Sequence, residues 1–313
     1  MAAPASTLAT PPVARSTSAR GRRRTTTRIG YAFAAPFLLL FGVFMALPIL
    51  ASFVLSFTDF GLANLTSPFD TAFVGLANYV ALFSDQTFLQ AALNTTLYTV
   101  GGVVSTLALG LAAAVGVNRA LGRFRAIFRV GYYLPVVTSI VAIAVIWRFL
   151  LDPSYGLLND LLRVFGFKEV NWLGDSTLAL PTITAIIVWR NLGNTMVLFL
   201  AGLQGISADI YEAARIDGAN RRQEFFGITW PLLHATTLFA AVMTTIGYLQ
   251  VFEEPFVMTQ GGPLNKTLSV SIYMYQQGFN FFHLGYASAI AYTMFVVIAA
   301  VTFLQFRVLR SET

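Results

Sequence analysis

The sequence has no cysteine, only two histidines and few charged residues. Asp, Glu, Lys and Arg make up 11% of its 313 residues, whereas soluble domains carry about 25%. Without cysteine the chain forms no disulfide and no thiolate metal site, and cysteine usage does not indicate an oxidising or a reducing compartment. His234 and His283 belong to no H-E-x-x-H pattern, so the sequence predicts no metal site and no catalytic residue. We therefore expect that the protein is not an enzyme.

A phosphate-binding loop is also missing. The pattern G-x-x-x-x-G-K-[ST] does not occur, and "GGPLNKT" at Gly261–Thr267 lacks the glycine that must directly precede the lysine. We therefore expect this chain to bind no nucleotide cofactor itself.

Hydrophobic residues are abundant. They make up 56% of the chain, and the mean hydropathy is +0.68. This composition is typical of an all-α polytopic membrane protein in contact with lipid. The net charge is +6, and the basic residues are distributed along the chain as membrane orientation requires, as described below. We therefore do not expect nucleic acid as a partner.

Residues 1–28 differ from the rest of the chain. They are rich in Ser, Thr, Ala and Pro, contain no acidic residue and hold six arginines. Such a composition buries no core, so the segment is predicted to be a disordered basic tail. An organelle transit peptide has a similar composition and is the alternative.

Six segments are apolar and long enough to cross a bilayer, which takes about 20 residues. They are Ile29–Thr58, Ala92–Val117, Val130–Leu151, Thr177–Leu203, Leu232–Phe252 and Tyr286–Phe306. The membrane domain is thus predicted to cover 29–308, with a short tail at 309–313. The segment "TLSVSIYMYQQGFNFF" before the last span is too polar to cross, and we expect it to be interfacial or partly re-entrant.

The basic residues predict the orientation. If the N-terminus lies inside, 15 of the 20 Lys and Arg residues fall on the cytoplasmic side, as the positive-inside rule requires. Both termini and the segment 206–232 are then cytoplasmic.

The segment 206–232 carries a charged insert between two spans. Ser207 is predicted to cap a short helix that starts near Ala208, and Gly218 to end it. Asn220 with Gln223 resembles a second capping pair. The apolar face of the first helix would contain Ile206, Ile210, Ala213 and Ala214. The pattern alone fits equally a docking helix for a partner and a connector that rests on lipid headgroups.

The order of residues resolves this ambiguity. "EAARIDGA" followed by "FFGITWPLL" resembles the EAA loop of ABC importer permeases, with pattern E-A-A-x-x-D-G-A and then I-x-x-P-L. The matching residues are Glu212, Ala213, Ala214, Asp217, Gly218, Ala219, Ile228, Pro231 and Leu232. Further stretches, such as "YGLLNDLLRVFG" and "QVFEEPFVMTQGGP", are similar to carbohydrate-uptake permeases of the maltose type. Gln260 and Glu253 depart from that family's usual Gly and Asp.

The resemblance implies a type I permease architecture and a transport role in a bacterial cell membrane. The chain would import di- or oligosaccharides by alternating access, and its EAA loop would dock on an ATPase subunit. Its partners would be a second homologous permease, two ATPase subunits that hold ATP and Mg²⁺, and an extracytoplasmic sugar-binding (lipo)protein.

Polar residues within or beside the spans are candidates for the sugar pathway. Arg190 lies within the fourth span, where a charge is costly, together with Asn191 and Asn194; Glu253 follows the fifth span. The alternative for Arg190 is a structural ion pair. Glu253 and Glu254, just past the fifth span, are the obvious partners for a second charge, but we favour a solvated position for both. An aromatic run is expected to form an interface belt rather than a sugar platform: Tyr273, Tyr275, Phe279, Phe281, Phe282 and Tyr286.

Two other functions compete with this interpretation. Arg190 is compatible with a permease for a phosphorylated solute such as glycerol 3-phosphate. An ion-coupled secondary transporter usually shows internal repeats and intramembrane acids, and neither is clear in the sequence.

The absence of cysteine makes the orientation directly testable. Asn220→Cys introduces a single thiol into the predicted cytoplasmic insert. We expect no labelling when a membrane-impermeant thiol reagent is added to intact cells, and full labelling after the cells are opened. Labelling of intact cells would reverse the predicted topology.

Overall fold

The computed structural model describes residues 31, 33–67, 70–119 and 122–310. Over these residues the chain is helical, and its only β-pairing is one isolated bridge between Thr58 and Phe73. The predicted all-α class is confirmed. The predicted tail at 1–28 and residues 311–313 lie outside the described residues. The chain divides into two compact units, Met1–Ser52 and Phe53–Thr313.

A charge-free helix begins in the first unit and ends three residues into the second. The helix Phe33–Leu55 is 23 residues long, which suffices to cross a bilayer. It includes a π-helical turn, η1 (Gly42–Ala46), followed by α2 (Leu47–Leu55). Its large side chains, such as Phe37 and Phe44, are exposed, as expected of a lipid-facing segment.

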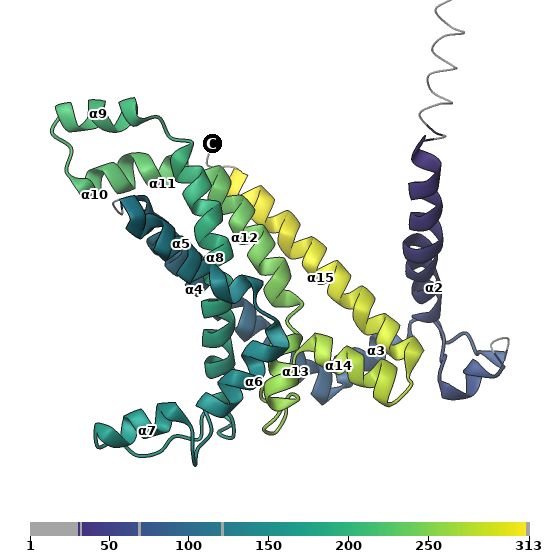
Figure 1. Ribbon diagram of the computed structural model, residues 1–313. Coiled ribbons are helices and arrows are strands. Elements are labelled where there is room, and N and C mark those ends of the chain that lie inside the picture. The colour runs from purple at the N-terminus through teal and green to yellow at the C-terminus, as the bar shows by residue number, and fades with distance from the viewer. Residues whose placement is uncertain (1–30, 32, 68–69, 120–121, 311–313) are drawn as a thin grey trace, which may run out of the picture. The chain divides into compact units, whose positions relative to one another are not determined.

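The second unit contains the other long apolar helices (Figure 1). They are α4 (Gln86–Arg119), α8 (Ala179–Gln204), α12 (His234–Leu249), which continues into α13 (Glu253–Thr259), and α15 (Leu284–Arg310). Together with Phe33–Leu55, five described helices are long and apolar enough to span a membrane. These five agree with predicted spans one, two, four, five and six.

The third predicted span is not a single helix. Instead of a continuous Val130–Leu151, the chain forms α5 (Gly122–Val137) and α6 (Ile140–Leu150), which meet at 98°. Pro135 inside α5 removes a backbone donor, and Ser139 begins α6 by accepting a hydrogen bond from the Ala142 N–H at 3.5 Å. The total is six spans when this bent pair counts as one.

Close backbone approach holds the bundle around α8. This helix packs against α4, α5 and α12. Gly193 of α8 lies so near α5 that a Cβ there would be 2.1 Å from the Tyr132 carbonyl oxygen, and a Cβ at Gly102 of α4 would enter the Tyr248 ring. Small residues at such crossings let helices contact each other without a hydrophobic driving force in lipid.

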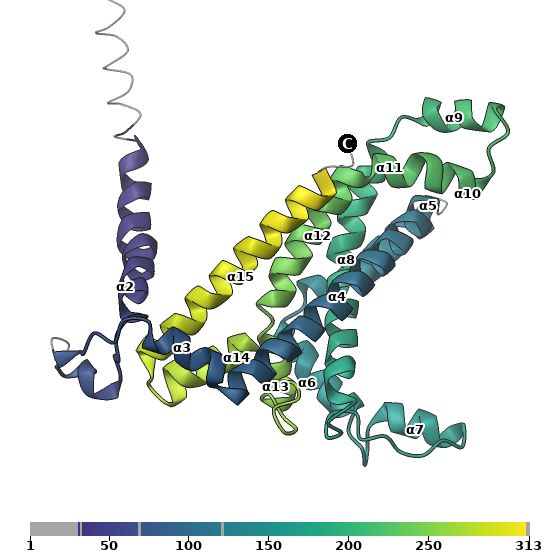
Figure 2. The same ribbon diagram turned by 180° about the vertical axis from the view of Figure 1, so that it is seen from behind.

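Short helices occupy the two ends of the bundle (Figures 1 and 2). One end carries α3 (Ala77–Ser84), α7 (Leu157–Val164) and α14 (Val270–Tyr275), which continues into η5 (Gln276–Asn280). The other end carries α9 (Ala208–Ile216), α10 (Arg221–Glu224), η4 (Phe225–Thr229) and α11 (Trp230–Leu232). A 3-10 turn, η2, covers Leu62–Leu65.

The segment predicted to be interfacial or re-entrant is α14 with η5. It does not cross the bundle, as expected, but much of it is core: Val270, Ile272 and Tyr273 are buried with Leu268 and Ile290. The aromatic run is therefore only partly a surface belt, since Phe279 and Phe281 are exposed whereas Tyr273 is not.

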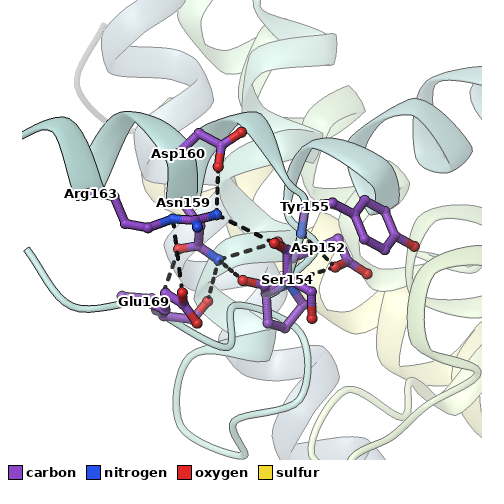
Figure 3. A network of polar contacts seen from close by, with 9 residues as sticks. Asp152, Ser154, Tyr155, Asn159, Asp160, Arg163 and Glu169 are labelled. Carbon is purple, nitrogen blue, oxygen red and sulfur yellow. Dashed lines mark hydrogen bonds and ion pairs between the residues drawn. The ribbon is translucent and has the colours of Figure 1, made fainter.

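The segment between α6 and α8 folds on itself at the α7 end (Figure 3). Asn159 is fully buried there, donates through Nδ2 to the Val170 carbonyl at 3.0 Å and accepts from the Val170 N–H at 3.1 Å. Arg163 pairs with Asp160 at 2.5 Å on the exposed side. These contacts give the loop a defined shape.

The close approach at Gly193 leads to a stability prediction. Gly193→Ala forces α5 and α8 apart, and overpacking of this kind costs about 1–3 kcal/mol. We expect a lower Tm of the detergent-solubilised protein, measured by fluorescence during heating. Gly247→Ala in α12, where a Cβ meets nothing within 4 Å, is the control and leaves Tm unchanged. Equal Tm values for both variants would contradict the packing described.

Candidate functional site

The charged insert forms the two short helices that its sequence predicts. The helix α9 begins at Ala208, and the Ser207 Oγ accepts a hydrogen bond from the Asp209 N–H at 3.3 Å. Gly218 follows its end with φ +82°, a left-handed conformation that suits glycine. The Ala219 N–H then donates to the Ala214 carbonyl at 2.9 Å, which completes a helix stop of the Schellman type.

The second helix starts with the predicted capping pair. Asn220 Oδ1 accepts from the Arg222 and Gln223 N–H groups, both at 3.0 Å, and Gln223 Oε1 accepts from the Asn220 N–H at 2.8 Å. This reciprocal box satisfies otherwise free donors. The connection between α9 and α10 is thereby fixed locally at both ends.

The EAA residues lie largely on the surface. Glu212, Ala213, Asp217 and Gly218 are exposed, while Ala214 and Ala219 are half-buried. Ile216, which the motif match does not include, is 86% exposed. Glu212 and Ile216 are four residues apart and therefore share one side of α9. This side of α9 is therefore accessible to another molecule.

The opposite side of α9 faces the rest of the loop. Arg215 pairs with Glu224 of α10, and Tyr211 hydrogen-bonds to Thr229 of η4. The sequence analysis did not pair these residues. No local pattern signals a contact across a turn, although the buried position of Glu224 requires a partner of opposite charge.

The structure pairs Arg190 with a residue that we expected to be solvated. The Arg190 Nε lies 2.6 Å from Glu254 Oε1, and their side chains are 17% and 2% exposed. The expectation for Glu254 was wrong because α13 packs against α6 and α8, which removes this side chain from solvent. Glu253, its neighbour, is exposed as expected. The ion-pair alternative for Arg190 is therefore the one that the structure shows.

The other pathway candidates are not gathered at one point. Asn191 is half-buried and Asn194 is exposed. A hollow of about 590 Å³ lies instead along α4 and α8, and none of the four predicted pathway residues lines it. Its lining residues are Leu97, Gly101, Ser105, Leu109, Leu180, Pro181, Thr184, Ala185, Val188, Trp189 and Leu192.

A second polar cluster ties the short helices of the α7 end together. Asp85, just before α4, accepts hydrogen bonds from the hydroxyls of Tyr273 and Tyr286, the latter at 2.7 Å. Burial raises the pKa of the Asp85 carboxyl, but these bonds and those from the Phe88 and Thr87 N–H groups outweigh it, so the pKa lies below its usual value. Burial and the Asp85 contact raise the pKa of Tyr273 to about 12.

Metal binding has no support in the described residues, where no three His, Cys, Asp or Glu side chains are grouped to hold an ion. The candidate site thus consists of an exposed helix, α9, at one end of the bundle, a buried ion pair between α8 and α13, and a hollow along α4 and α8.

Comparison with known proteins identifies the class. The family model described as "Binding-protein-dependent transport system inner membrane component" matches residues 106–311. The chain is 34% identical over 279 residues to the arabinooligosaccharide transport system permease protein AraP of Bacillus subtilis (strain 168), which covers 88% of this chain and 87% of that protein. It is 36% identical over 289 residues to the lactose transport system permease protein LacF of Rhizobium radiobacter, with 90% and 94% covered.

The fold agrees with a solved transporter. A chain in the crystal structure of a bacterial alginate ABC transporter, in complex with an alginate pentasaccharide-bound periplasmic protein, matches with a TM-score of 0.81. The two chains are 23% identical, and 93% of this chain and 97% of the other are covered. The protein therefore belongs to the family of binding-protein-dependent transport system inner-membrane components. It is a multi-pass membrane permease of the ABC importer type, a transport subunit that works with a substrate-binding protein and an ATPase.

The Arg190–Glu254 pair yields a stability prediction. Glu254→Gln leaves the Arg190 guanidinium buried without its counter-ion, and removing one partner of a buried pair costs about 3–5 kcal/mol. We expect a clearly lower Tm of the purified protein, and the same loss for Arg190→Leu. Glu253→Gln, at the exposed neighbouring position, serves as the matched control and keeps the wild-type Tm. An unchanged Tm in Glu254→Gln would show that the pair carries no stability.

Proposed function

We propose that the chain is one of two permease subunits of an ATP-driven importer for di- or oligosaccharides. The sequence relatives AraP and LacF are named for arabinooligosaccharides and lactose. The hollow along α4 and α8 is lined by apolar residues with only the Ser105 and Thr184 hydroxyls among them and no charged side chain, so it offers no partner for a charged solute.

The state of Arg190 favours a neutral sugar over a phosphorylated solute. A phosphate would be recognised by an uncompensated positive charge, whereas the charge of Arg190 is already compensated by the buried Glu254 carboxylate, whose Oε1 lies 2.6 Å from the Arg190 Nε. Arg190, Asn191, Asn194 and Glu253, which do not line the hollow, then have no charge-recognition role. Glycerol 3-phosphate becomes the less favoured substrate.

The observation that carries the proposal is the exposed side of α9. Glu212, Ala213 and Ile216 stand out from the bundle on a helix whose two ends are capped. We infer that this side docks on an ATPase subunit, that two such subunits bind ATP and Mg²⁺, and that a second homologous permease completes the membrane path. The residues of the motif that serve this contact are Glu212, Ala213, Ala214, Asp217, Gly218 and Ala219.

Docking of an ATPase subunit on α9 would also define the orientation of the bundle across the membrane. The α9 end and both termini are then cytoplasmic, and the α7 end faces an extracytoplasmic sugar-binding protein. ATP binding closes the two ATPase subunits, moves α9, and shifts the bundle between inward-open and outward-open states. Sugar released by the binding protein enters the outward-open path.

Two variants of α9 test this proposal. Gly218→Val places a β-branched residue at φ +82°, and Glu212→Lys reverses a charge on the exposed side. We expect both chains to insert normally, while ATP hydrolysis by the assembled complex and uptake of labelled lactose, maltose or arabinotriose fall by about fivefold or more. Arg221→Ala, an exposed change beyond the motif, is the control. Full uptake and hydrolysis in both variants would contradict a coupling role for α9.

A further inference from the structure

The chain holds α9 by two narrow connections. Residues 205–207 join it to α8, and residues 217–220 join it to α10. Figures 1 and 2 both show α9 and α10 as two arms of a loop at the end of the bundle. The Gly218 stop and the Asn220 capping pair fix these connections only locally, so the position of α9 relative to the bundle depends on its side-chain contacts.

Two side chains from one side of α9 bridge this loop. Tyr211 and Arg215 are four residues apart, so they share a side of the helix. Arg215 Nε donates to Glu224 Oε1 at 2.9 Å, and the Tyr211 hydroxyl lies 2.9 Å from Thr229 Oγ1. Glu212 directly follows Tyr211, and Ile216 directly follows Arg215. One position turns a side chain by about 100° around the helix, so Glu212 and Ile216 lie on the exposed side.

The acidic partner of the ion pair is buried and the basic partner is exposed. The Glu224 side chain is 9% exposed, whereas that of Arg215 is 65% exposed. A buried carboxylate loses its hydration and needs a charged partner, and Arg215 is the one cation that pairs with Glu224 among the described residues. The pair is thus anchored in the bundle and reaches outward to α9.

The second bridge leads into the bundle as well. Thr229 is buried, and its Oγ1 donates to the Glu224 carbonyl at 3.2 Å, so the two bridges are connected to each other. Thr229 ends η4, and Leu233 after α11 directly precedes α12. A displacement of α9 is therefore passed through these contacts to the start of a spanning helix.

The bridges also border a small cavity. It measures about 160 Å³, and Arg215, Glu224, Tyr211 and Thr229 line it together with residues of the ends of α4 and α8: Val115, Asn118 and Leu203. Space on this side would let α9 tilt toward the bundle if the bridges were removed. The bridges therefore decide whether α9 moves with the bundle or independently of it.

We propose that Arg215 and Tyr211, through Glu224 and Thr229, are positioning residues that lock the coupling helix to the bundle. This inference rests on the proposed function of α9 and adds how motion passes from α9 into the spans. Docking itself uses the other side of the helix. Loss of the bridges leaves ATPase binding intact and uncouples hydrolysis from transport.

The position of α9 can be measured without sugar or ATPase. Ile216→Cys on α9 and Phe303→Cys on α15, both exposed, accept spin labels in a chain that has no other thiol. We expect pulsed electron–electron double resonance on the detergent-solubilised chain to give a narrow distribution of the distance between the two labels when the sequence is otherwise native. We expect Glu224→Gln and Arg215→Gln to broaden it and Arg215→Lys, which keeps the charge, to broaden it less. An unchanged width in Glu224→Gln overturns the proposal.

A rescue experiment separates positioning from general damage to the fold. In Arg215→Cys/Glu224→Cys, complexes purified with both ATPase subunits keep hydrolysis near wild type, but uptake of labelled lactose, maltose or arabinotriose per ATP falls about fivefold or more. A short bifunctional methanethiosulfonate that joins the two thiols restores the uptake ratio, and the single-cysteine variants gain nothing from it. Wild-type coupling before cross-linking, or no recovery after it, contradicts the proposal.

The outcomes distinguish this inference from the function on which it depends. If Glu212→Lys uncouples the complex and the bridge variants do not, the positioning role of Arg215 and Tyr211 is refuted, while the docking role of α9 is supported. If Glu212→Lys has no effect, the docking role fails, and the distance distribution still decides whether the bridges hold α9.

Discussion

The absence of water within the bilayer is the constraint on which the structure depends. Backbone N–H and C=O groups have no solvent partner there, so the chain crosses only as helices whose hydrogen bonds are internal. The same constraint acts on side chains. Arg190 lies within a span, and its Nε lies 2.6 Å from Oε1 of Glu254, which is buried in the first turn of α13. This pair fixes α13 against α8 and so shapes the end of the fifth span.

The helices associate through close contact rather than through burial from water. Lipid offers no hydrophobic drive between spans, so approach of backbones at Gly102 and Gly193 takes its place. Charges that cannot be paired inside are confined to the ends. The α9 end collects carboxylates and arginines on short capped helices, and these become the part of the permease that a soluble subunit can reach.

Much of the fold could be predicted from the sequence because its signals are local. Long apolar runs predicted five of the helices, and Ser207, Gly218 and Asn220 marked helix ends through contacts with residues within five positions. The break between α5 and α6 was not predicted, although Pro135 and Ser139 lie there, because an apolar run does not show whether the helix axis changes direction within it. An ion pair was an alternative for Arg190, but its partner Glu254 was not assigned and the Arg215–Glu224 pair was not predicted, because each pair joins different helices and one sequence gives no information on such contacts.

The central claim is that energy enters this permease through α9. Hydrogen–deuterium exchange measured by mass spectrometry, on the permease complex with and without its ATPase subunits, tests it most directly. The account predicts that the amides of Ala208–Ile216 become protected when the ATPase subunits bind, while those of α7 exchange as before. Protection that is absent from α9, or that appears at the α7 end instead, would contradict it.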